Sequence, residues 1–167
     1  MNYSVIRPLD IANGTGVRVS LFVSGCRNRC KGCFNPETWS FTYGQEFTHE
    51  TLLEIERMLE NPNIEGLSIL GGDPFEPENR ECVDMICKLM WLYHPGKTIW
   101  VWTGYSYEDL KDLPVMQYIG VLVDGRFEED LKDLRLKYRG SSNQRVIDVQ
   151  ASLKSGKVVL WESKDAL

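Results

Sequence analysis

Residues 16–33 read GVRVSLFVSGCRNRCKGC and join a predicted strand directly to a cluster of three cysteines. Val17, Val19 and Leu21 alternate with other side chains at the period of two that is typical of a strand, so we predict a buried strand, the first of the sheet, over residues 16–23. Ligands of parallel sheets bind beyond the C-terminal ends of the strands. The cysteines therefore stand where a functional site is expected.

The rest of the chain alternates between strand patterns and helix patterns. Helices are predicted after Thr48, after Gly71-Gly72-Asp73-Pro74, after Ser106 and over residues 128–134, and strands over residues 67–70, 98–103, 118–123, 144–149 and 157–161. This order indicates an α/β fold with a parallel sheet and right-handed crossovers. An eight-fold barrel needs about 250 residues. This chain of 167 residues is therefore predicted to form a partial, open β/α barrel with a short C-terminal β extension, as a single domain over residues 1–167.

Composition narrows the class of protein. The formal net charge of −5 argues against a nucleic-acid partner, because phosphate recognition usually requires a basic surface. Apolar runs such as residues 98–102 are far shorter than the roughly 20 residues that cross a bilayer, and the N-terminus lacks the pattern of a secretory signal. Five cysteines, three of them close together, fit a metal or redox site better than a disulfide framework. We therefore expect a cytoplasmic protein with neither nucleic acid nor membrane as a partner.

The three clustered cysteines, Cys26, Cys30 and Cys33, have the spacing C-x3-C-x2-C. Soft thiolate ligands favour an iron-sulfur cluster or zinc. A structural zinc site needs four ligands, and no further Cys or His lies at zinc-finger distance, whereas three ligands on a four-iron cluster leave one iron open. The basic side chains between the cysteines are expected to lower the pKa values of the thiols.

The cysteine spacing after a strand, in a chain of alternating strands and helices, resembles that of the radical S-adenosylmethionine superfamily. Gly32 and the residues Cys33-Phe34-Asn35 are similar to those of the family of proteins that activate anaerobic ribonucleoside-triphosphate reductase. Three further stretches resemble this family: Trp102-Thr103-Gly104-Tyr105, Asp124-Gly125-Arg126-Phe127 and Arg139-Gly140-Ser141-Ser142-Asn143-Gln144-Arg145. The resemblance therefore covers most of the chain.

The turn Gly71-Gly72-Asp73-Pro74 resembles the superfamily's glycine-glycine-acid-proline turn. In relatives this turn binds the amino group of the methionine moiety, so the resemblance implies that Gly71, Gly72 and Asp73 bind the cofactor. Two positions differ from common patterns: Asn28 stands where many relatives have histidine, and Asp73 stands where much of the superfamily has glutamate. Neither difference removes a predicted cluster ligand.

The resemblance also implies an activity and a partial barrel of the radical S-adenosylmethionine type. Cys26, Cys30 and Cys33 would hold a [4Fe-4S] cluster whose open iron is chelated by S-adenosylmethionine. An electron from the reduced cluster would break the cofactor into methionine and a 5'-deoxyadenosyl radical, which would take a hydrogen atom from one glycine of the partner. The implied partner is the glycyl radical subunit of anaerobic ribonucleoside-triphosphate reductase. Such an oxidoreductase needs an electron donor such as reduced flavodoxin. The cofactors carry out the difficult steps of the reaction, and the protein binds and positions them.

For several residues the sequence allows two roles. Thr103 and Asp124 end neighbouring predicted strands and either contact the ribose of the cofactor or a bound cation, or belong to ordinary loops. The run at residues 141–144 either meets the cofactor or turns the chain. Cys82 and Cys87 lie among apolar residues of a predicted helix, where they are expected to pack in the core.

Two other functions stay open on the sequence alone. One is a different small radical S-adenosylmethionine enzyme, such as the activator of another glycyl radical enzyme. The other is a non-catalytic interaction module that binds zinc. Metal analysis separates them, because about four iron and four sulfide per chain indicate the enzyme and one zinc without sulfide indicates the module.

Overall fold

A mixed sheet of seven strands forms the centre of the computed structural model, which describes residues 1–162. The strands are β1 (Asn2–Asp10), β2 (Val17–Val23), β3 (Gln45–Glu46), β4 (Ile64–Gly71), β5 (Thr98–Trp102), β6 (Val121–Asp124) and β7 (Arg145–Asp148). Their order across the sheet is β3-β1-β2-β4-β5-β6-β7. The central strands β2, β4, β5 and β6 run parallel, and the others pair antiparallel at the two sides. The predicted α/β class is confirmed, with a sheet that is mixed rather than all parallel.

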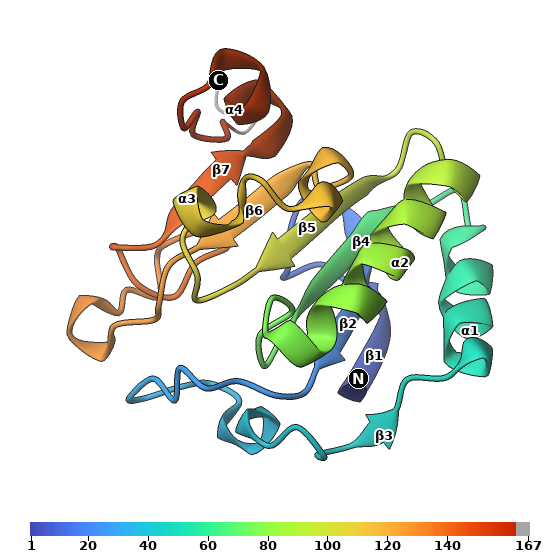
Figure 1. Ribbon diagram of the computed structural model, residues 1–167, viewed down its shortest axis with the longest axis horizontal. Coiled ribbons are helices and arrows are strands. Elements are labelled where there is room, and N and C mark those ends of the chain that lie inside the picture. The colour runs from blue at the N-terminus through green and yellow to red at the C-terminus, as the bar shows by residue number, and fades with distance from the viewer. Residues whose placement is uncertain (163–167) are drawn as a thin grey trace.

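Within residues 1–162, the first three helices connect the parallel strands and the fourth follows β7. They are α1 (His49–Leu59), α2 (Pro77–Tyr93), α3 (Tyr107–Leu110) and α4 (Val149–Ser155), with 3-10 turns η1 (Pro36–Trp39), η2 (Pro114–Gln117) and η3 (Glu129–Leu131). Figure 1 shows α1, α2 and α3 in front of the sheet and α4 beyond β7. Thr48 caps α1 as predicted, because its side chain accepts a hydrogen bond from the Thr51 N–H within a capping box. No helix within residues 1–162 combines the length and the apolar character that a bilayer crossing requires.

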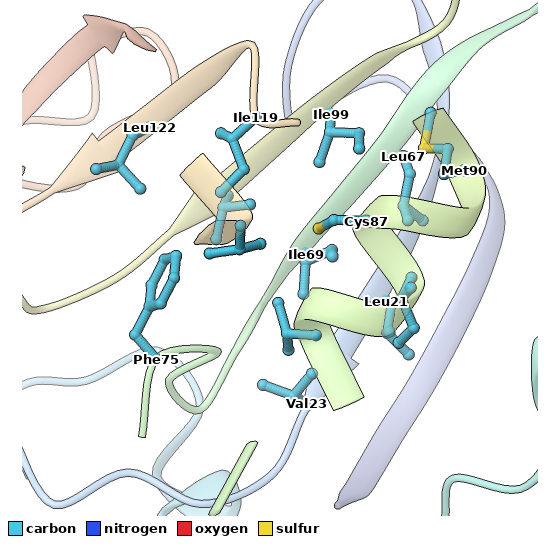
Figure 2. Packing of buried hydrophobic residues seen from close by; sticks show 14 of the residues in the cluster. Leu21, Val23, Leu67, Ile69, Phe75, Cys87, Met90, Ile99, Ile119 and Leu122 are labelled. Atoms are coloured by element: carbon cyan, nitrogen blue, oxygen red, sulfur yellow. The ribbon is translucent and has the colours of Figure 1, made fainter. Parts of the chain in front are cut away.

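The hydrophobic core lies between the central strands and the helices in front of them. Alternate strand residues, such as Leu21 and Ile69, are fully buried in this layer. α2 contributes Cys87 and Met90 to the same cluster, and Figure 2 shows their sulfur atoms among the strand side chains. Cys87 is therefore a core residue, as predicted, and Cys82 packs against the edge of this core.

The N-terminal strand β1 was missed by the sequence prediction, which placed the first strand at residues 16–23. β1 pairs antiparallel with β2 on the side away from β4. Tyr3 and Asp10 are its only buried residues, so its sequence shows little of the apolar alternation that marks a strand. The cysteines consequently follow the second strand of the sheet.

The predicted C-terminal β extension is only partly correct. β7 confirms the strand predicted over residues 144–149, but the chain then turns into the helix α4. The Asp148 side chain caps this helix by accepting from the Ala151 N–H, and Gly156 ends it in the left-handed conformation, with φ 74°. Such end signals favour a helix even in a segment too short for a clear periodic pattern.

Two other short elements also differ from expectation. Where a strand was predicted over residues 157–161, the described chain has a single antiparallel bridge between Ile147 and Leu160. The helix predicted over residues 128–134 is reduced to the 3-10 turn η3. Both segments are short and lie in loops, where tertiary contacts outweigh local propensity.

The face of the sheet opposite α2 holds a fully buried arginine. Arg18 on β2 is 0% exposed, and its guanidinium donates to the hydroxyls of Ser68 (2.8 Å) and Thr98 (2.9 Å) and to three main-chain carbonyls. The Trp100 ring lies 5.7 Å from it. Burial lowers the pKa of Arg18 to about 10, so the side chain stays charged at neutral pH. This one cation therefore ties β2 to β4 and β5.

We expect Arg18→Ala to lower the free energy of unfolding by about 2–5 kcal/mol, because it leaves a cavity and several buried acceptors without a donor. Urea unfolding followed by circular dichroism measures this change. Arg7→Ala is the matched control: Arg7 is exposed on β1 and lies over Phe22, so its loss should cost about 1 kcal/mol or less. Equal losses for the two variants would contradict the role given to Arg18.

Candidate metal centre

The parallel strands end at one edge of the sheet, and the residues singled out in the sequence follow these ends. Val23, the last residue of β2, pairs with Gly71, the last residue of β4. β5 and β6 lie parallel beside them, with Thr103 and Asp124 at their ends. In Figure 1 the segments after β2 (blue) and after β6 (orange) lie on the same side of the sheet. The fold thus gathers these segments at one edge.

The cysteine loop, residues 24–35, is anchored through its backbone. The Gly25 N–H donates to the Thr38 carbonyl of η1 at 2.7 Å. Gly25 and Gly32 adopt φ values of 99° and 73°, which glycine allows without strain. The three cysteines of the loop are free and partly exposed. The three cysteines therefore lie in one loop that stays partly open to solvent.

The pKa of Cys26 departs from the sequence expectation. Burial raises the pKa of this thiol to about 11, and nearby carboxylates act in the same direction. Two of the three cations of the loop are engaged elsewhere, because Arg27 pairs with Glu76 and Lys31 pairs with Glu129. The predicted lowering of the pKa is thus wrong for Cys26. A metal that binds the sulfur displaces its proton even so.

The turn after β4 packs its backbone against the cysteine loop. The Gly72 N–H donates to the Val23 carbonyl (2.7 Å), and the Asp73 N–H donates to the Gly25 carbonyl (2.8 Å). A Cβ on Gly72 would lie 2.7 Å from the Gly25 oxygen, and one on Gly71, at φ 109°, would lie 2.6 Å from the Val23 oxygen. Both glycines are therefore required by the close approach of two backbones, independently of any ligand.

Asp73 joins the cysteine loop to the strand ends. Its carboxylate is 1% exposed. One oxygen accepts from the Phe75 N–H (2.9 Å) and the Thr103 hydroxyl (2.8 Å), and the other accepts from the Gly104 N–H (2.8 Å) and the Asn28 amide (3.2 Å). Burial raises the pKa of Asp73 to about 6, against the opposing effect of these hydrogen bonds, so the group is ionised at pH 7. Both oxygens are thus occupied by protein donors.

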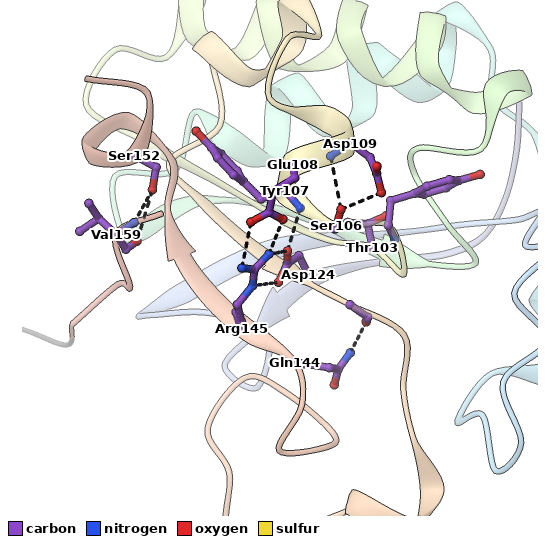
Figure 3. A network of polar contacts seen from close by, with 12 residues as sticks. Thr103, Ser106, Tyr107, Glu108, Asp109, Asp124, Gln144, Arg145, Ser152 and Val159 are labelled. Atoms are coloured by element: carbon purple, nitrogen blue, oxygen red, sulfur yellow. Dashed lines mark hydrogen bonds and ion pairs between the residues drawn. The ribbon is translucent and has the colours of Figure 1, made fainter. Parts of the chain in front are cut away.

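Asp124 lies in a separate polar network, which Figure 3 shows. Its carboxylate is 1% exposed and accepts from Arg145 through Nε (3.0 Å) and Nη2 (2.5 Å) and from the Tyr107 N–H (2.8 Å). Glu108 pairs with the same arginine at 2.7 Å. Asp124 therefore joins β6 to α3 and β7, whereas Thr103 contacts the residues around the cysteine loop.

A second loop, residues 125–144, packs on the cysteine loop, and the sequence did not indicate this contact. The Phe127 ring lies 5.2 Å from the Phe34 ring, and the Arg126 guanidinium donates to the Asn28 carbonyl at 2.6 Å. The two loops border an open hollow of about 330 Å³ that is lined by Cys30, Lys31, Arg126, Phe127, Glu128, Glu129 and Asp130. A cysteine thus faces a recess formed by both loops.

The polar run at residues 141–144 shapes this second loop. The Gln144 side-chain oxygen accepts from the N–H groups of Gly140 (2.9 Å) and Ser141 (3.1 Å). Its amide nitrogen donates to the Gly125 carbonyl (2.9 Å). The run therefore turns the chain, and its contact with the cofactor stays a prediction.

Glu76 was not singled out in the sequence, but the structure places it beside the cysteine loop. Its carboxylate is 1% exposed and accepts from both the backbone N–H (2.6 Å) and the guanidinium (2.7 Å) of Arg27. In the sequence, Glu76 resembles the acidic residues that commonly begin helices, which the helix dipole favours. Nothing in local spacing indicates a partner 49 positions earlier.

The donor set of the cysteine loop fits an iron-sulfur cluster. Three soft thiols lie on one loop, and the backbone holds that loop from η1 and from the turn after β4. Within residues 1–162, no three Cys, His, Asp or Glu side chains are grouped so that they could hold a single metal ion. A four-iron cluster takes each thiolate on a different iron, so its ligands need not converge on one point.

Comparison with known proteins assigns the chain to a class. Residues 12–147 match the family described as "4Fe-4S single cluster domain", so the chain belongs to this class of iron-sulfur proteins. This match favours the iron-sulfur reading of the cysteines over a zinc module. The particular family follows from relatives that align along almost their whole length.

Three such relatives carry the same name, anaerobic ribonucleoside-triphosphate reductase-activating protein. The protein of Enterobacteria phage T4 is 44% identical over 146 residues, which cover 87% of this chain and 93% of the relative. The protein of Escherichia coli K12 is 45% identical over 150 residues, covering 87% and 97%. The protein of Vibrio cholerae is 43% identical over 148 residues, covering 86% and 96%. The chain belongs to this family of activating proteins, and the resemblance identified in the sequence is confirmed.

Proposed function

We propose that this protein uses a [4Fe-4S] cluster and S-adenosylmethionine to install a glycyl radical on an anaerobic ribonucleoside-triphosphate reductase. One observation carries the proposal: a loop with three free cysteines follows a parallel strand and packs directly on a Gly-Gly-Asp turn. The names of the relatives support the choice of partner. An electron donor such as reduced flavodoxin completes the proposed system.

Cys26, Cys30 and Cys33 are the proposed cluster ligands, which leaves one iron for S-adenosylmethionine. The bound cluster, when reduced, supplies the electron that splits S-adenosylmethionine into methionine and a 5'-deoxyadenosyl radical. The four parallel strands that end around this loop support a partial β/α barrel of the radical S-adenosylmethionine type. The cofactor is accordingly proposed to bind at the C-terminal edge of the sheet.

The remaining site residues receive separate roles in this proposal. Gly71 and Gly72 present main-chain groups to the cofactor, since their missing side chains let the turn lie against the cysteine loop. Asp73 and Thr103 border the cofactor and keep the loop in place through their mutual hydrogen bond. Asp124 stabilises the C-terminal end of β6, near the proposed cofactor, through its pairing with Arg145.

The test is anaerobic reconstitution with iron and sulfide, followed by dithionite and S-adenosylmethionine, with 5'-deoxyadenosine measured by chromatography. We expect about four iron and four sulfide per chain and formation of 5'-deoxyadenosine. Addition of the reductase subunit should then give a glycyl radical signal by electron paramagnetic resonance. An intact cluster that yields no 5'-deoxyadenosine would contradict the proposed chemistry, and cleavage without a radical on the reductase would contradict the proposed partner.

A further inference from the structure

Glu76 brings a buried carboxylate to the start of the cysteine loop. It stands at the N-terminal cap of α2, and its side chain is 1% exposed. One oxygen accepts from the N–H of Arg27, the residue that follows Cys26, at 2.6 Å. The other oxygen accepts from Nη1 of the same arginine at 2.7 Å. The helix start is thus joined to the loop beside its first cysteine.

Glu78 contacts the same arginine in a different environment. Its carboxylate accepts from Nη1 at 2.9 Å and also from Nη2 of Arg27, but its side chain is 49% exposed. Solvent screens an exposed charge far more strongly than a buried one. Of the two carboxylates, Glu76 is the one that is buried and bonded to the main chain of the loop, so its charge should act more strongly on a bound cluster.

We propose that Glu76 is a positioning residue that holds the Cys26 end of the loop and keeps the reduction potential of the bound cluster low. The proposal rests on the cluster ligands assigned above. Cluster potentials depend on local charge and on hydrogen bonds to the sulfur atoms. A buried negative charge opposes the addition of an electron, and the Arg27 N–H, already bonded to Glu76, is unavailable to a cluster sulfur. A low potential serves a reaction in which the cluster must reduce a sulfonium.

Glu76→Gln tests this role, because it keeps the size of the side chain and removes its charge. The reconstituted proteins are titrated with dithionite, and the one-electron reduced cluster is measured by electron paramagnetic resonance. At equal ambient potential we expect the ratio of reduced to oxidised cluster to rise by about tenfold, which is a shift of about +59 mV for one electron. Glu78→Gln is the matched control and should change this ratio by about twofold or less.

A double variant separates the charge from a general structural effect. Arg27→Gln with Glu76→Gln removes the buried carboxylate together with an arginine side chain that is 57% exposed and therefore screened by solvent, so the potential of the double variant should lie between those of Glu76→Gln and the wild type, nearer to Glu76→Gln. A wild-type potential in Glu76→Gln, or a double variant whose potential lies above that of Glu76→Gln, would overturn the proposal. If Glu76→Gln holds no cluster, Arg27→Gln is compared with the double variant, which differs only at Glu76. A higher potential in the double variant supports the proposal, and equal potentials overturn it.

Failure of this inference is distinct from failure of the proposed function. A wild-type chain that assembles no four-iron cluster, or a Cys26→Ala variant that still cleaves S-adenosylmethionine, contradicts the ligand assignment. A wild-type protein that forms 5'-deoxyadenosine, together with equal potentials in all cluster-bearing variants, contradicts only the role of Glu76.

Discussion

Replacing Cys30 with alanine is expected to abolish the formation of 5'-deoxyadenosine by the reconstituted protein. Cys30 is partly exposed beside the hollow between the two loops, and it is one of three proposed cluster ligands. Loss of a residue that merely supports a metal ligand typically costs 10–100-fold, so loss of a ligand itself should cost more than about 100-fold. Iron content, sulfide content and 5'-deoxyadenosine yield are measured on the same samples.

Cys82→Ala is the matched control for this experiment. Cys82 lies on α2 and packs against the hydrophobic core, away from the cysteine loop in sequence. Its replacement should leave iron content and cleavage unchanged and lower the free energy of unfolding by about 1 kcal/mol. Retained cleavage in Cys30→Ala, or equal loss in both variants, would remove the basis for the proposed metal centre.

Asp73→Ala is expected to weaken both the fold and the site. Four hydrogen bonds converge on this buried carboxylate, from the cysteine loop, its own turn and the end of β5. Their loss leaves buried donors unsatisfied, which should lower the free energy of unfolding by about 2–4 kcal/mol. The cysteine loop also loses its tie to Thr103 and Gly104, so the rate of S-adenosylmethionine cleavage should fall by about tenfold or more.

A graded series gives this prediction its control. Thr103→Val removes one of the four donors and keeps the shape of the side chain, so it should cost only about 0.5–1.5 kcal/mol. Asp73→Asn keeps one oxygen acceptor and should fall between the two variants. Urea unfolding and 5'-deoxyadenosine yield are measured for all three. An Asp73→Ala variant as stable and as active as Thr103→Val would show that these contacts do not organise the site.

The prediction of the fold succeeded where residues close in the sequence carry the signal. Thr48 and Thr51 form their cap within one turn of helix, and the apolar alternation of β2 is visible along seven consecutive residues. The prediction failed for β1, because only Tyr3 and Asp10 of this strand are buried and its sequence shows no clear apolar alternation. It also failed for α4, where the caps at Asp148 and Gly156 outweigh a weak periodic pattern.

The candidate site divides in the same way. The spacing of Cys26, Cys30 and Cys33 and the Gly-Gly-Asp turn are local patterns, and they indicate metal chemistry without knowledge of the fold. The roles of the charged residues could not be inferred from local sequence patterns. The loop cation Arg27 was expected to lower thiol pKa values, yet it is paired with Glu76. Asp124 ends a strand as expected, yet its carboxylate is bound to Arg145.

The sequence by itself indicated the kind of chemistry, because three thiols within eight residues, at the spacing C-x3-C-x2-C, can be brought to one metal cluster by a single loop. Only the tertiary structure decided how that loop is held. Asp73 meets Asn28 across 45 positions, and Glu76 meets Arg27 across 49 positions. Contacts between residues so far apart arise when the parallel strands end at one edge of the sheet. These contacts cannot be predicted from a local pattern of residues, because they depend on how the whole chain packs.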